Sequence, residues 1–394
     1  MIILLGVLFL SLGLFLFFNK IKFYKISQIS FLKNIPLPLC LLFLLWGYMS
    51  LSCLWSLNPL YAFGTSFRLL VTLILGVCSV FWIKHLPKKN LEYCLIFLLI
   101  SWASLFCILL CNVFVQKVLF FPSYTPFPLK ICSSLTKQSL LLSLFFWPIC
   151  SFFVFISHLR PFASLPFPKK ETLFLGLGIL VFLITLFLPM KAASIALALG
   201  LIGYLFLKRY PQTLTLILGS LIGGGFLFPI LHILFLNVNP LSSHFVSVPF
   251  ISWQHRIFIW NFTYEKIKAH PFFGWGLDAS RFLPREKDWM TFVESNGVLT
   301  QHLVSPLSSH PHNAFFQLWL EGGAVGAFLL ACFLFSLVTY IKKAYPSVHD
   351  RALLGGTFIS VLIPLYVSFG IWQIWWIATL CFIIILWKMI KKIK

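Results

Sequence analysis

The sequence predicts an all-α integral membrane protein with about 11–12 transmembrane helices and one long outer loop that contains an interfacial helix. Three observations predict this class. The 394 residues are 60% hydrophobic and only 10% charged, whereas soluble domains contain about 25% charged residues. The apolar residues form runs close to the roughly 20 residues that cross a bilayer. Basic residues gather in alternate breaks between these runs.

The apolar runs predict the positions of the spans. We expect membrane helices at residues 2–18, 36–54, 62–83, 91–111, 138–157, 172–189, 192–207, 212–236, 314–341, 352–370 and 371–388. The first run has neither a basic leading segment nor an Ala-x-Ala-like cleavage site, so we expect it to be a retained span and not a signal peptide.

The basic breaks predict the orientation of the chain. They contain Lys20, Lys22, Lys25 and Lys33, then Lys84, Lys88 and Lys89, then Arg160, Lys169 and Lys170, then Lys208 and Arg209, then Lys342, Lys343 and Arg351, and the tail "WKMIKKIK". The positive-inside rule places these breaks and the C-terminus inside. One break that this orientation places outside contains Lys117, Lys130 and Lys137 and does not fit the rule, but the other breaks agree with it. Orientation and contact with anionic membrane lipid explain the net charge of +21 better than nucleic-acid binding does.

The spans divide the chain into three regions. Residues 1–236 form an N-terminal bundle of about eight spans, residues 237–313 form the outer loop, and residues 314–394 contain about three further spans. The loop holds five of the nine acidic residues and six of the ten histidines. A loop of this length in a compact fold is usually functional or disordered. Its aromatic residues favour a functional loop that contains the catalytic residues.

The first half of the loop, "WQHRIFIWNFTYEKIKAH", predicts an interfacial helix. Its apolar stripe consists of Trp253, Ile257, Trp260, Tyr264 and Ile267, which recur at helical spacing. Such a helix would face the lipid headgroups or the top of the bundle. Arg256 falls on the edge of the stripe and is expected to point inward. Pro271 ends the helix, and Gly274 and Gly276 allow tight turns.

The second half of the loop ends in "HPHNAFFQLWLEGGAVG", where a span begins near His312. Pro311 favours a helix start and Asn313 is a suitable cap. A helix start also attracts phosphate. Asn313, Gln317 and Glu321 are four residues apart and form a polar track on one helix face. Gly323 and Gly326 leave room for a neighbouring helix.

Some of these residues have simpler explanations. His312 is consistent with an ordinary interfacial histidine, and Arg256 with an arginine that reaches for lipid phosphates. A carboxylate inside a span is costly, so we expect Glu321 to be structural and bonded to a neighbouring helix. Lys191 and Arg68 are cations at the outer ends of spans. An anionic substrate would explain both cations. Either one alone is also explained by a side chain that extends to the lipid headgroups.

The sequence contains no metal-ligand pattern. His310 and His312 are two residues apart, which is the wrong spacing for one helix face. The ten cysteines fall almost wholly within spans and include no Cys-x-x-Cys pair, so we expect neither a disulfide frame nor a zinc site.

Four stretches resemble the O-antigen ligase and polymerase superfamily. "LSCLWSLNPLYAF" resembles its Trp-Ser-x-Asn-Pro turn, and "RIFIWNFTYEKIKAHPFFGWGL" resembles its Arg-x-x-x-Trp helix followed by Pro-x-x-Gly-x-Gly. "HNAFFQLWLEGGAVG" fits the ligase pattern of His-Asn, nine residues and Gly-x-x-Gly, and "PMKAASIA" weakly resembles a Ser-Arg-Gly or Ser-Arg-Ala motif. Together they extend from about residue 40 to residue 341.

The resemblance implies a multi-pass glycosyltransferase of the bacterial inner membrane with its active site facing the periplasm. Such enzymes take a glycan from undecaprenyl diphosphate without a metal or cofactor, and the ligases transfer it to lipid A-core or another glycan acceptor in lipopolysaccharide biosynthesis. If the roles of the family's motif residues apply to the matching positions of this sequence, His312 is the catalytic base and Arg256 binds the diphosphate. Lys191 replaces the family arginine and keeps its charge without the planar fork. Lys191, Arg68, Asn313 and Gln317 are the expected substrate contacts.

The alternatives differ in chemistry. An O-antigen polymerase or another lipid-linked oligosaccharide transferase would use the same donor, and the His-Asn spacing favours a ligase. A transporter of lipid-linked sugars predicts charges deep in several spans and an internal repeat, and the sequence has neither. We expect Arg256 and His312 to border one outward-opening cavity, with Lys191 or Arg68 on its wall.

Overall fold

The computed structural model describes residues 35–118, 129–156, 170–235, 251–283, 288–293, 299–304, 306–307 and 309–394. The first expected span, residues 2–18, lies outside these residues. In the described part of the chain, nine helices are long and apolar enough to cross a membrane. The prediction of an all-α integral membrane protein is therefore confirmed.

The membrane helices follow the predicted runs. They are α3 (Leu37–Leu51, extended by η1 at Ser52–Trp55), α4 (Pro59–Ile83), α5 (Lys88–Val118), α6 (Leu129–Ile156), α7 (Lys170–Leu186), α8 (Lys191–Arg209), α9 (Leu214–Phe235, preceded by η3 at Pro211–Thr213), α11 (Ala314–Ala344), α12 (Val348–Val367) and α13 (Ile374–Ile393). Each matches one predicted span. Nine of these ten helices are long enough to cross a membrane, with α3 counted together with η1, and the tenth, α7, has only 17 residues.

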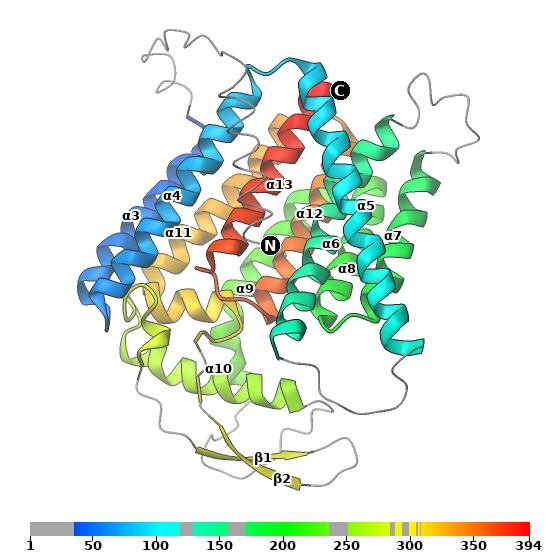
Figure 1. Cartoon of the computed structure of the whole chain (residues 1–394). Helices are drawn as coiled ribbons and strands as arrows, with labels where there is room; N and C mark the ends of the chain where they lie inside the picture. Colours follow the sequence, from blue (N-terminus) through cyan, green and yellow to red (C-terminus); the bar gives the residue numbers. More distant parts are fainter. Residues whose placement is uncertain are drawn as a thin grey trace.

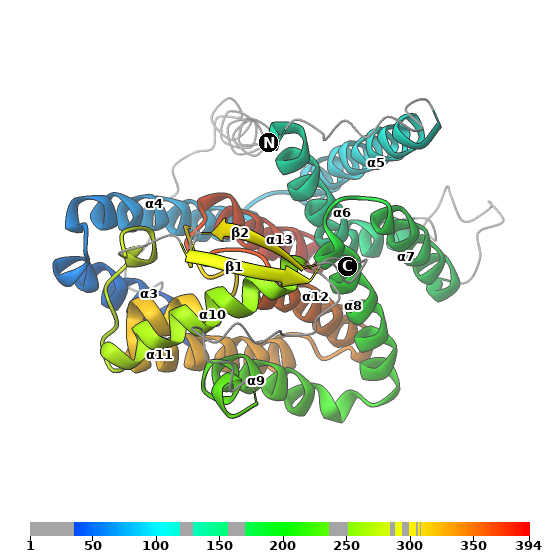
Figure 2. The ribbon, with the colours of Figure 1, turned by 90° about the horizontal axis from the view of Figure 1, so that it is seen from below.

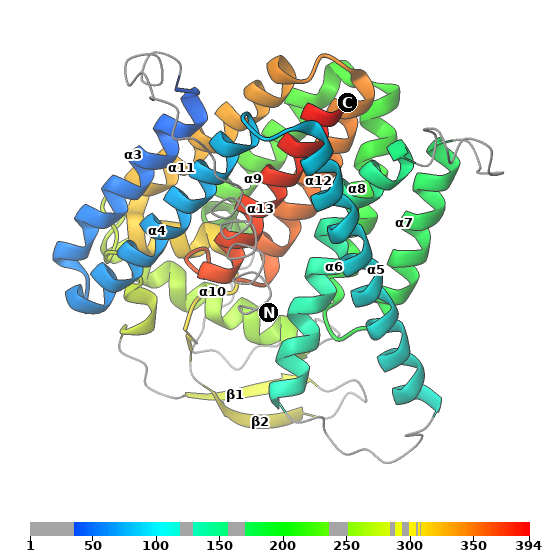
Figure 3. The ribbon, with the colours of Figure 1, turned by 45° about the horizontal axis from the view of Figure 1, so that its top comes forward.

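The two ends of the bundle differ (Figures 1 and 3). One end, which we call the loop end, carries α10 (Ile251–Ala269) and a hairpin of β1 (Asp288–Val293) and β2 (Leu299–Val304). The opposite end holds the C-terminus and the connections from α4 to α5, from α8 to α9 and from α11 to α12. Lys84, Lys208 and Lys342 lie at this opposite end, so these three basic breaks share one side, as the alternation of charge predicts.

The hairpin was not predicted. The strands are antiparallel, and Trp289 pairs with Leu303. The sequence between them contains Asn296-Gly297, a common hairpin turn signal. The loop was expected to contain only a helix and turns.

Close helix packing holds the bundle beneath the loop end. Gly200 of α8 faces Gly356 of α12, where an added Cβ on either residue would lie 2.9 Å from the other's carbonyl oxygen. The buried Trp147 indole donates to the Ser360 hydroxyl at 2.9 Å, and that hydroxyl donates to the Ala196 carbonyl at 2.8 Å. Small residues and paired polar groups let these helices approach closely without leaving polar atoms exposed to lipid.

The loop end is built on α11. This helix packs against α3, α9 and α12, and α10 packs against its first turns. Figure 2 shows α10 beside α11, with the hairpin next to α10. The start of α11 is therefore enclosed by the bundle and by the loop helix.

Candidate functional site

The helix α11 is broken near its start, and a loop fills the break. Gly323 has a non-helical backbone, with φ 60° and ψ −161°. The Pro271 carbonyl accepts from Ala324 N at 2.8 Å, and Phe272 accepts from Val325 N at 3.2 Å. In return, Trp275 N and Gly276 N each donate at 2.9 Å to the carbonyls of Leu320 and Glu321. The loop thus replaces the hydrogen bonds that the break removes.

Glycines permit this contact between two backbones. A Cβ on Gly323 would lie 2.4 Å from the carbonyl of Phe272, and one on Gly274 would lie 2.4 Å from the carbonyl carbon of Glu321. A neighbouring helix was expected at both Gly323 and Gly326. At Gly323 the neighbour is the loop, because the positive φ turns the chain towards it. At Gly326 the neighbour is Tyr48 of α3, at ordinary contact distance.

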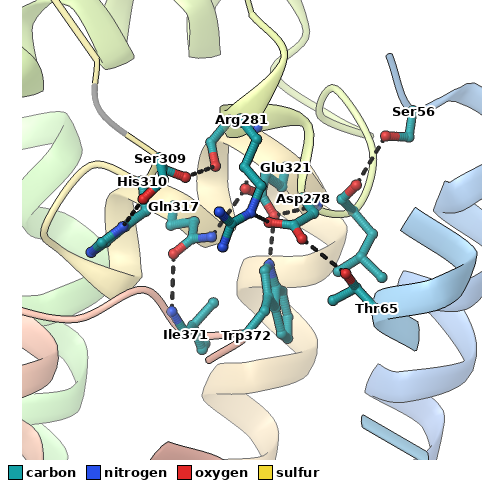
Figure 4. Close-up of polar contacts among 12 residues, drawn as sticks. Ser56, Thr65, Asp278, Arg281, Ser309, His310, Gln317, Glu321, Ile371 and Trp372 are labelled. Atoms are coloured by element: carbon teal, nitrogen blue, oxygen red, sulfur yellow. Dashed lines mark hydrogen bonds and ion pairs between the residues drawn. The ribbon is translucent and has the colours of Figure 1, made fainter. Parts of the chain in front are cut away.

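Glu321 is fully buried and accepts hydrogen bonds from four groups (Figure 4). Its Oε2 accepts from Asp278 N at 2.8 Å and from the Trp372 indole at 2.5 Å. Its Oε1 accepts from Gln317 Nε2 at 3.1 Å and from Ser280 N at 3.4 Å. A buried carboxylate is tolerated only when it is bonded in this way. Glu321 therefore joins α11 to the loop after α10 and to the connection between α12 and α13.

The other two residues of the polar track are also engaged. Gln317 Oε1 accepts from Ile371 N at 2.9 Å, so its amide bridges Glu321 and the connection between α12 and α13. Asn313 caps α11, as expected, by accepting from Phe315 N at 2.9 Å and Phe316 N at 3.1 Å. The Asn313 side chain is buried, and its Nδ2 has no hydrogen-bond partner among the described residues.

His312 lies just before the cap, in a left-handed backbone conformation with φ 56°. Its Nδ1 lies 3.1 Å from the carbonyl oxygen of Ser368. A carbonyl only accepts, so Nδ1 carries the proton and the lone pair of the neutral ring is on Nε2. Burial lowers the pKa of His312, the bond to Ser368 opposes this, and the charge of Arg256 lowers it further. The ring is thus held neutral, in the tautomer of a base.

His310 lies beside His312, with ring centroids 4.5 Å apart. Its Nδ1 is 2.9 Å from the Ser309 hydroxyl. Burial lowers the pKa of His310 to about 4, and the charge of Arg281 and the repulsion that a protonated His312 would exert lower it too. Both histidines are therefore neutral near pH 7, and the pair adds no charge of its own to the site.

The helix α10 places Arg256 on the side of the bundle where His312 lies. One turn after Arg256, the Trp260 indole donates to the Pro311 carbonyl at 3.0 Å. The Trp260 ring stacks on Phe316, with centroids 5.8 Å apart and an interplanar angle of 9°. Burial lowers the pKa of Arg256, and its charge acts on the pKa of His312. The segment before α11 thus lies against α10, and Arg256 is close enough for its charge to act on His312.

A second group of cations lies around Asp278, which sequence reasoning did not single out as a site residue. The Asp278 carboxylate pairs with Arg281 Nε at 2.9 Å and accepts from the Thr65 hydroxyl at 2.9 Å. Arg68 Nη2 donates to that hydroxyl at 2.9 Å. Arg281 was missed because its neighbours in "LDASRF" match no motif. Only the fold brings it to Arg68.

Lys191 lies at the first residue of α8, at the loop end. Its exposed ammonium donates to the Leu186 carbonyl at 2.5 Å. Within the described residues, no hydrogen bond or ring contact joins Lys191 to His312 or Arg256. Those residues also contain no cluster of three or more His, Cys, Asp and Glu side chains that could hold a metal.

The fold and the site together define a multi-pass membrane protein with a neutral histidine and several arginines at one end. A histidine base accepts a proton from a hydroxyl, and arginines stabilise developing negative charge. A site of this kind can deprotonate a hydroxyl and stabilise an anionic leaving group.

Comparisons with known proteins agree with this class. The O-antigen ligase family matches residues 177–331 of the chain. A Rickettsia conorii protein with the provisional name polysaccharide ligase is 28% identical over 362 residues, which cover 89% of this chain and 79% of the relative. Provisionally named polysaccharide ligases of Rickettsia felis and Rickettsia prowazekii are 30% and 31% identical. These two alignments cover 55% and 54% of this chain, and 52% of each relative. No solved structure matches the chain.

The chain is therefore similar to the O-antigen ligase family over residues 177–331 and to proteins named as polysaccharide ligases. The family match begins in α7 and ends in α11, so it contains Lys191, Arg256, Arg281, His312 and Glu321. Arg68 lies outside it.

Proposed function

We propose that the chain is an O-antigen ligase-like glycosyltransferase that moves a glycan from undecaprenyl diphosphate to a lipid A-core acceptor. We place the reaction at the periplasmic face of the bacterial inner membrane, on the side of the loop end. The observation that carries the proposal is the His312 ring, bonded through Nδ1 to Ser368 and neighbouring Arg256. The ligase family match and the similarly named relatives support the same reaction class.

The proposed step follows from the properties of these groups. His312 Nε2 takes the proton of the acceptor hydroxyl while the hydroxyl oxygen bonds to the anomeric carbon of the donor sugar. The bond from that carbon to the diphosphate oxygen breaks, and undecaprenyl diphosphate leaves with the electron pair. Arg256 stabilises the charge that grows on the leaving diphosphate, which a buried cation does more effectively than one in water.

Two further residues have proposed roles towards the substrates. We propose that Asn313 Nδ2, which is buried without a partner among the described residues, donates to a substrate oxygen. Lys191 also remains a proposed substrate contact. Its ammonium would exchange the Leu186 carbonyl for a phosphate oxygen. Gln317 is engaged at both ends of its amide, so we propose that it positions Ile371 and Glu321 around the site.

The test is lipopolysaccharide banding in ligase-deficient cells that express this chain. The proposal expects capped lipopolysaccharide with the wild-type chain and with His85→Ala, a histidine at the opposite end of the bundle. It expects none with His312→Ala at equal membrane abundance. Capping that survives His312→Ala would contradict the role of His312. Uncapped lipid-linked glycan with the wild-type chain would contradict the lipid A-core acceptor and favour a polymerase.

A further inference from the structure

Two guanidinium groups flank one aromatic ring at the loop end. Arg68 of α4 and Arg281 of the loop after α10 each lie 5.8 Å from the centroid of the Tyr61 ring. Asp278 connects them, because it bonds Arg281 directly and Arg68 through the Thr65 hydroxyl. Figure 4 shows Arg281, Asp278 and Thr65 in this arrangement. We call Tyr61, Thr65, Arg68, Asp278 and Arg281 the arginine cluster.

The arginine cluster carries more positive than negative charge. It contains two guanidinium groups and one carboxylate. The neighbouring carboxylate, Glu321, already accepts four hydrogen bonds from other groups. Asp278 is only 3% exposed, whereas the Arg281 side chain is 36% exposed and Arg68 is exposed. The buried carboxylate thus orients cations that reach the surface, where a further anion would balance the charge.

The surface next to the cluster is apolar. Val71 and Leu75 follow Arg68 by three and seven positions on nearly the same face of α4, and they are 40% and 50% exposed. Phe282 contacts Tyr61 edge-on at 5.2 Å and is 37% exposed. An anion bound at Arg68 would therefore have an apolar path leading from it along a membrane helix.

The cluster also borders the proposed reaction site. The charge of Arg281 acts on the pKa of His310, and the His310 ring lies 4.5 Å from the His312 ring. The same Asp278 that holds Arg281 donates its backbone N–H to Glu321. The position of Arg281 is thus tied to the residues that hold the start of α11.

We propose that Arg68 and Arg281 bind the phosphate group of a lipid-linked substrate whose hydrocarbon chain lies along the exposed face of α4. The inference rests on the proposed function, which supplies two such substrates. One is the undecaprenyl diphosphate donor and the other is the phosphorylated lipid A acceptor. Planar guanidinium groups suit either, because they bind two phosphate oxygens at once.

The test measures binding to the full-length protein in phosphatidylcholine nanodiscs. The probes are undecaprenyl diphosphate and lipid A, and the variants are Arg68→Gln, Arg281→Gln and Arg281→Lys. Each glutamine variant loses a charged hydrogen bond to phosphate, so each should bind at least one of the two probes about tenfold more weakly than the wild type, or weaker still. Partial recovery is expected with Arg281→Lys. Arg209→Gln is the matched control, since Arg209 also faces a tyrosine ring, at the opposite end.

The outcomes separate the two substrates. If only undecaprenyl diphosphate binds more weakly, the arginine cluster binds the donor. If only lipid A binds more weakly, the cluster binds the acceptor. If both probes bind more weakly, the cluster is a phosphate site that the two substrates share. Arg68→Gln leaves the bond between Arg281 and Asp278 in place, so it tests the cluster even if Arg281→Gln misfolds. The proposal would be overturned if Arg68→Gln and a folded Arg281 variant both bound the two probes with affinities within twofold of the wild-type affinity. Equal competition by phosphatidylglycerol would also overturn it.

The same samples distinguish this inference from the proposed function. His312→Gln is expected to bind both probes as the wild type does and to transfer no glycan. Transfer by His312→Gln would contradict the proposed function while leaving the binding result at the arginine cluster intact.

Discussion

The Nδ1 atom of His312 lies 3.1 Å from the carbonyl oxygen of Ser368. This contact joins the residue before the Asn313 cap of α11 to the connection between α12 and α13. It fixes the proton on Nδ1, so the neutral ring presents a basic Nε2. The cap of α11 at Asn313 and the contact of Trp260 with Pro311 hold the same segment from two other sides.

The pH dependence of glycan transfer should reflect the lowered pKa of His312. The base must be neutral, so the rate should be constant above the pKa and fall as the pH drops through it. Because burial lowers the pKa of His312, the acid limb should lie below the ordinary histidine pKa of about 6.5. A profile of kcat/KM against pH measures this limb. A limb above pH 7 would contradict a buried neutral base.

Arg256 should contribute to the chemical step more than to folding. Arg256→Ala removes a partly buried guanidinium beside His312 and should lower kcat by about 10²–10³-fold. The kcat of Arg256→Lys should lie between those of Arg256→Ala and the wild type, because lysine keeps the positive charge but lacks the planar guanidinium group. Single-turnover transfer by purified protein measures the effect, with Arg209→Ala as control. Full activity of Arg256→Ala would rule out this role.

Glu321 should determine the stability of the loop end. Glu321→Gln places an amide NH₂ against N–H donors and leaves buried groups unpaired, which should cost about 2–3 kcal/mol. The expected result is a lower thermal unfolding temperature in detergent. The control is Glu265→Gln, at an exposed glutamate of α10 that pairs with Lys268. Equal unfolding temperatures for the two variants would show that the four hydrogen bonds to Glu321 contribute little.

The two glycines after Glu321 should respond differently to alanine. Gly323→Ala forces a Cβ onto a positive φ and to within 2.4 Å of the Phe272 carbonyl, which should cost about 3 kcal/mol or more. Gly326→Ala meets Tyr48 at an ordinary 3.4 Å, so its effect should stay within about 1 kcal/mol. The yield of monodisperse protein and the unfolding temperature measure both. Similar losses for both would contradict a break specific to Gly323.

The membrane helices could be predicted from the sequence because their length and composition are set by the bilayer. The cap at Asn313 could also be predicted, since capping depends on a few neighbouring residues. The end of α10 at Ala269, just before Pro271, follows from the same local rules.

The contacts between distant segments could not be predicted in this way. Nothing near Glu321 in the sequence indicates Trp372 or the loop at Asp278 as its partners. The break at Gly323 depends on a loop that ends some 50 residues earlier in the sequence, and a lone Gly-x-x-Gly pattern is equally consistent with an unbroken helix. Arg281 joins the site through Asp278 and Thr65, which lie on separate segments.

The most direct test of the central claim is single-turnover glycan transfer by the purified protein. The substrates are undecaprenyl-diphosphate-linked glycan and lipid A-core, and the variants are His312→Ala and His85→Ala. If His312 is the base, His312→Ala should lose about 10²–10⁴-fold in rate while still binding undecaprenyl diphosphate, and His85→Ala should match the wild type. Transfer by His312→Ala at the wild-type rate would contradict the claim.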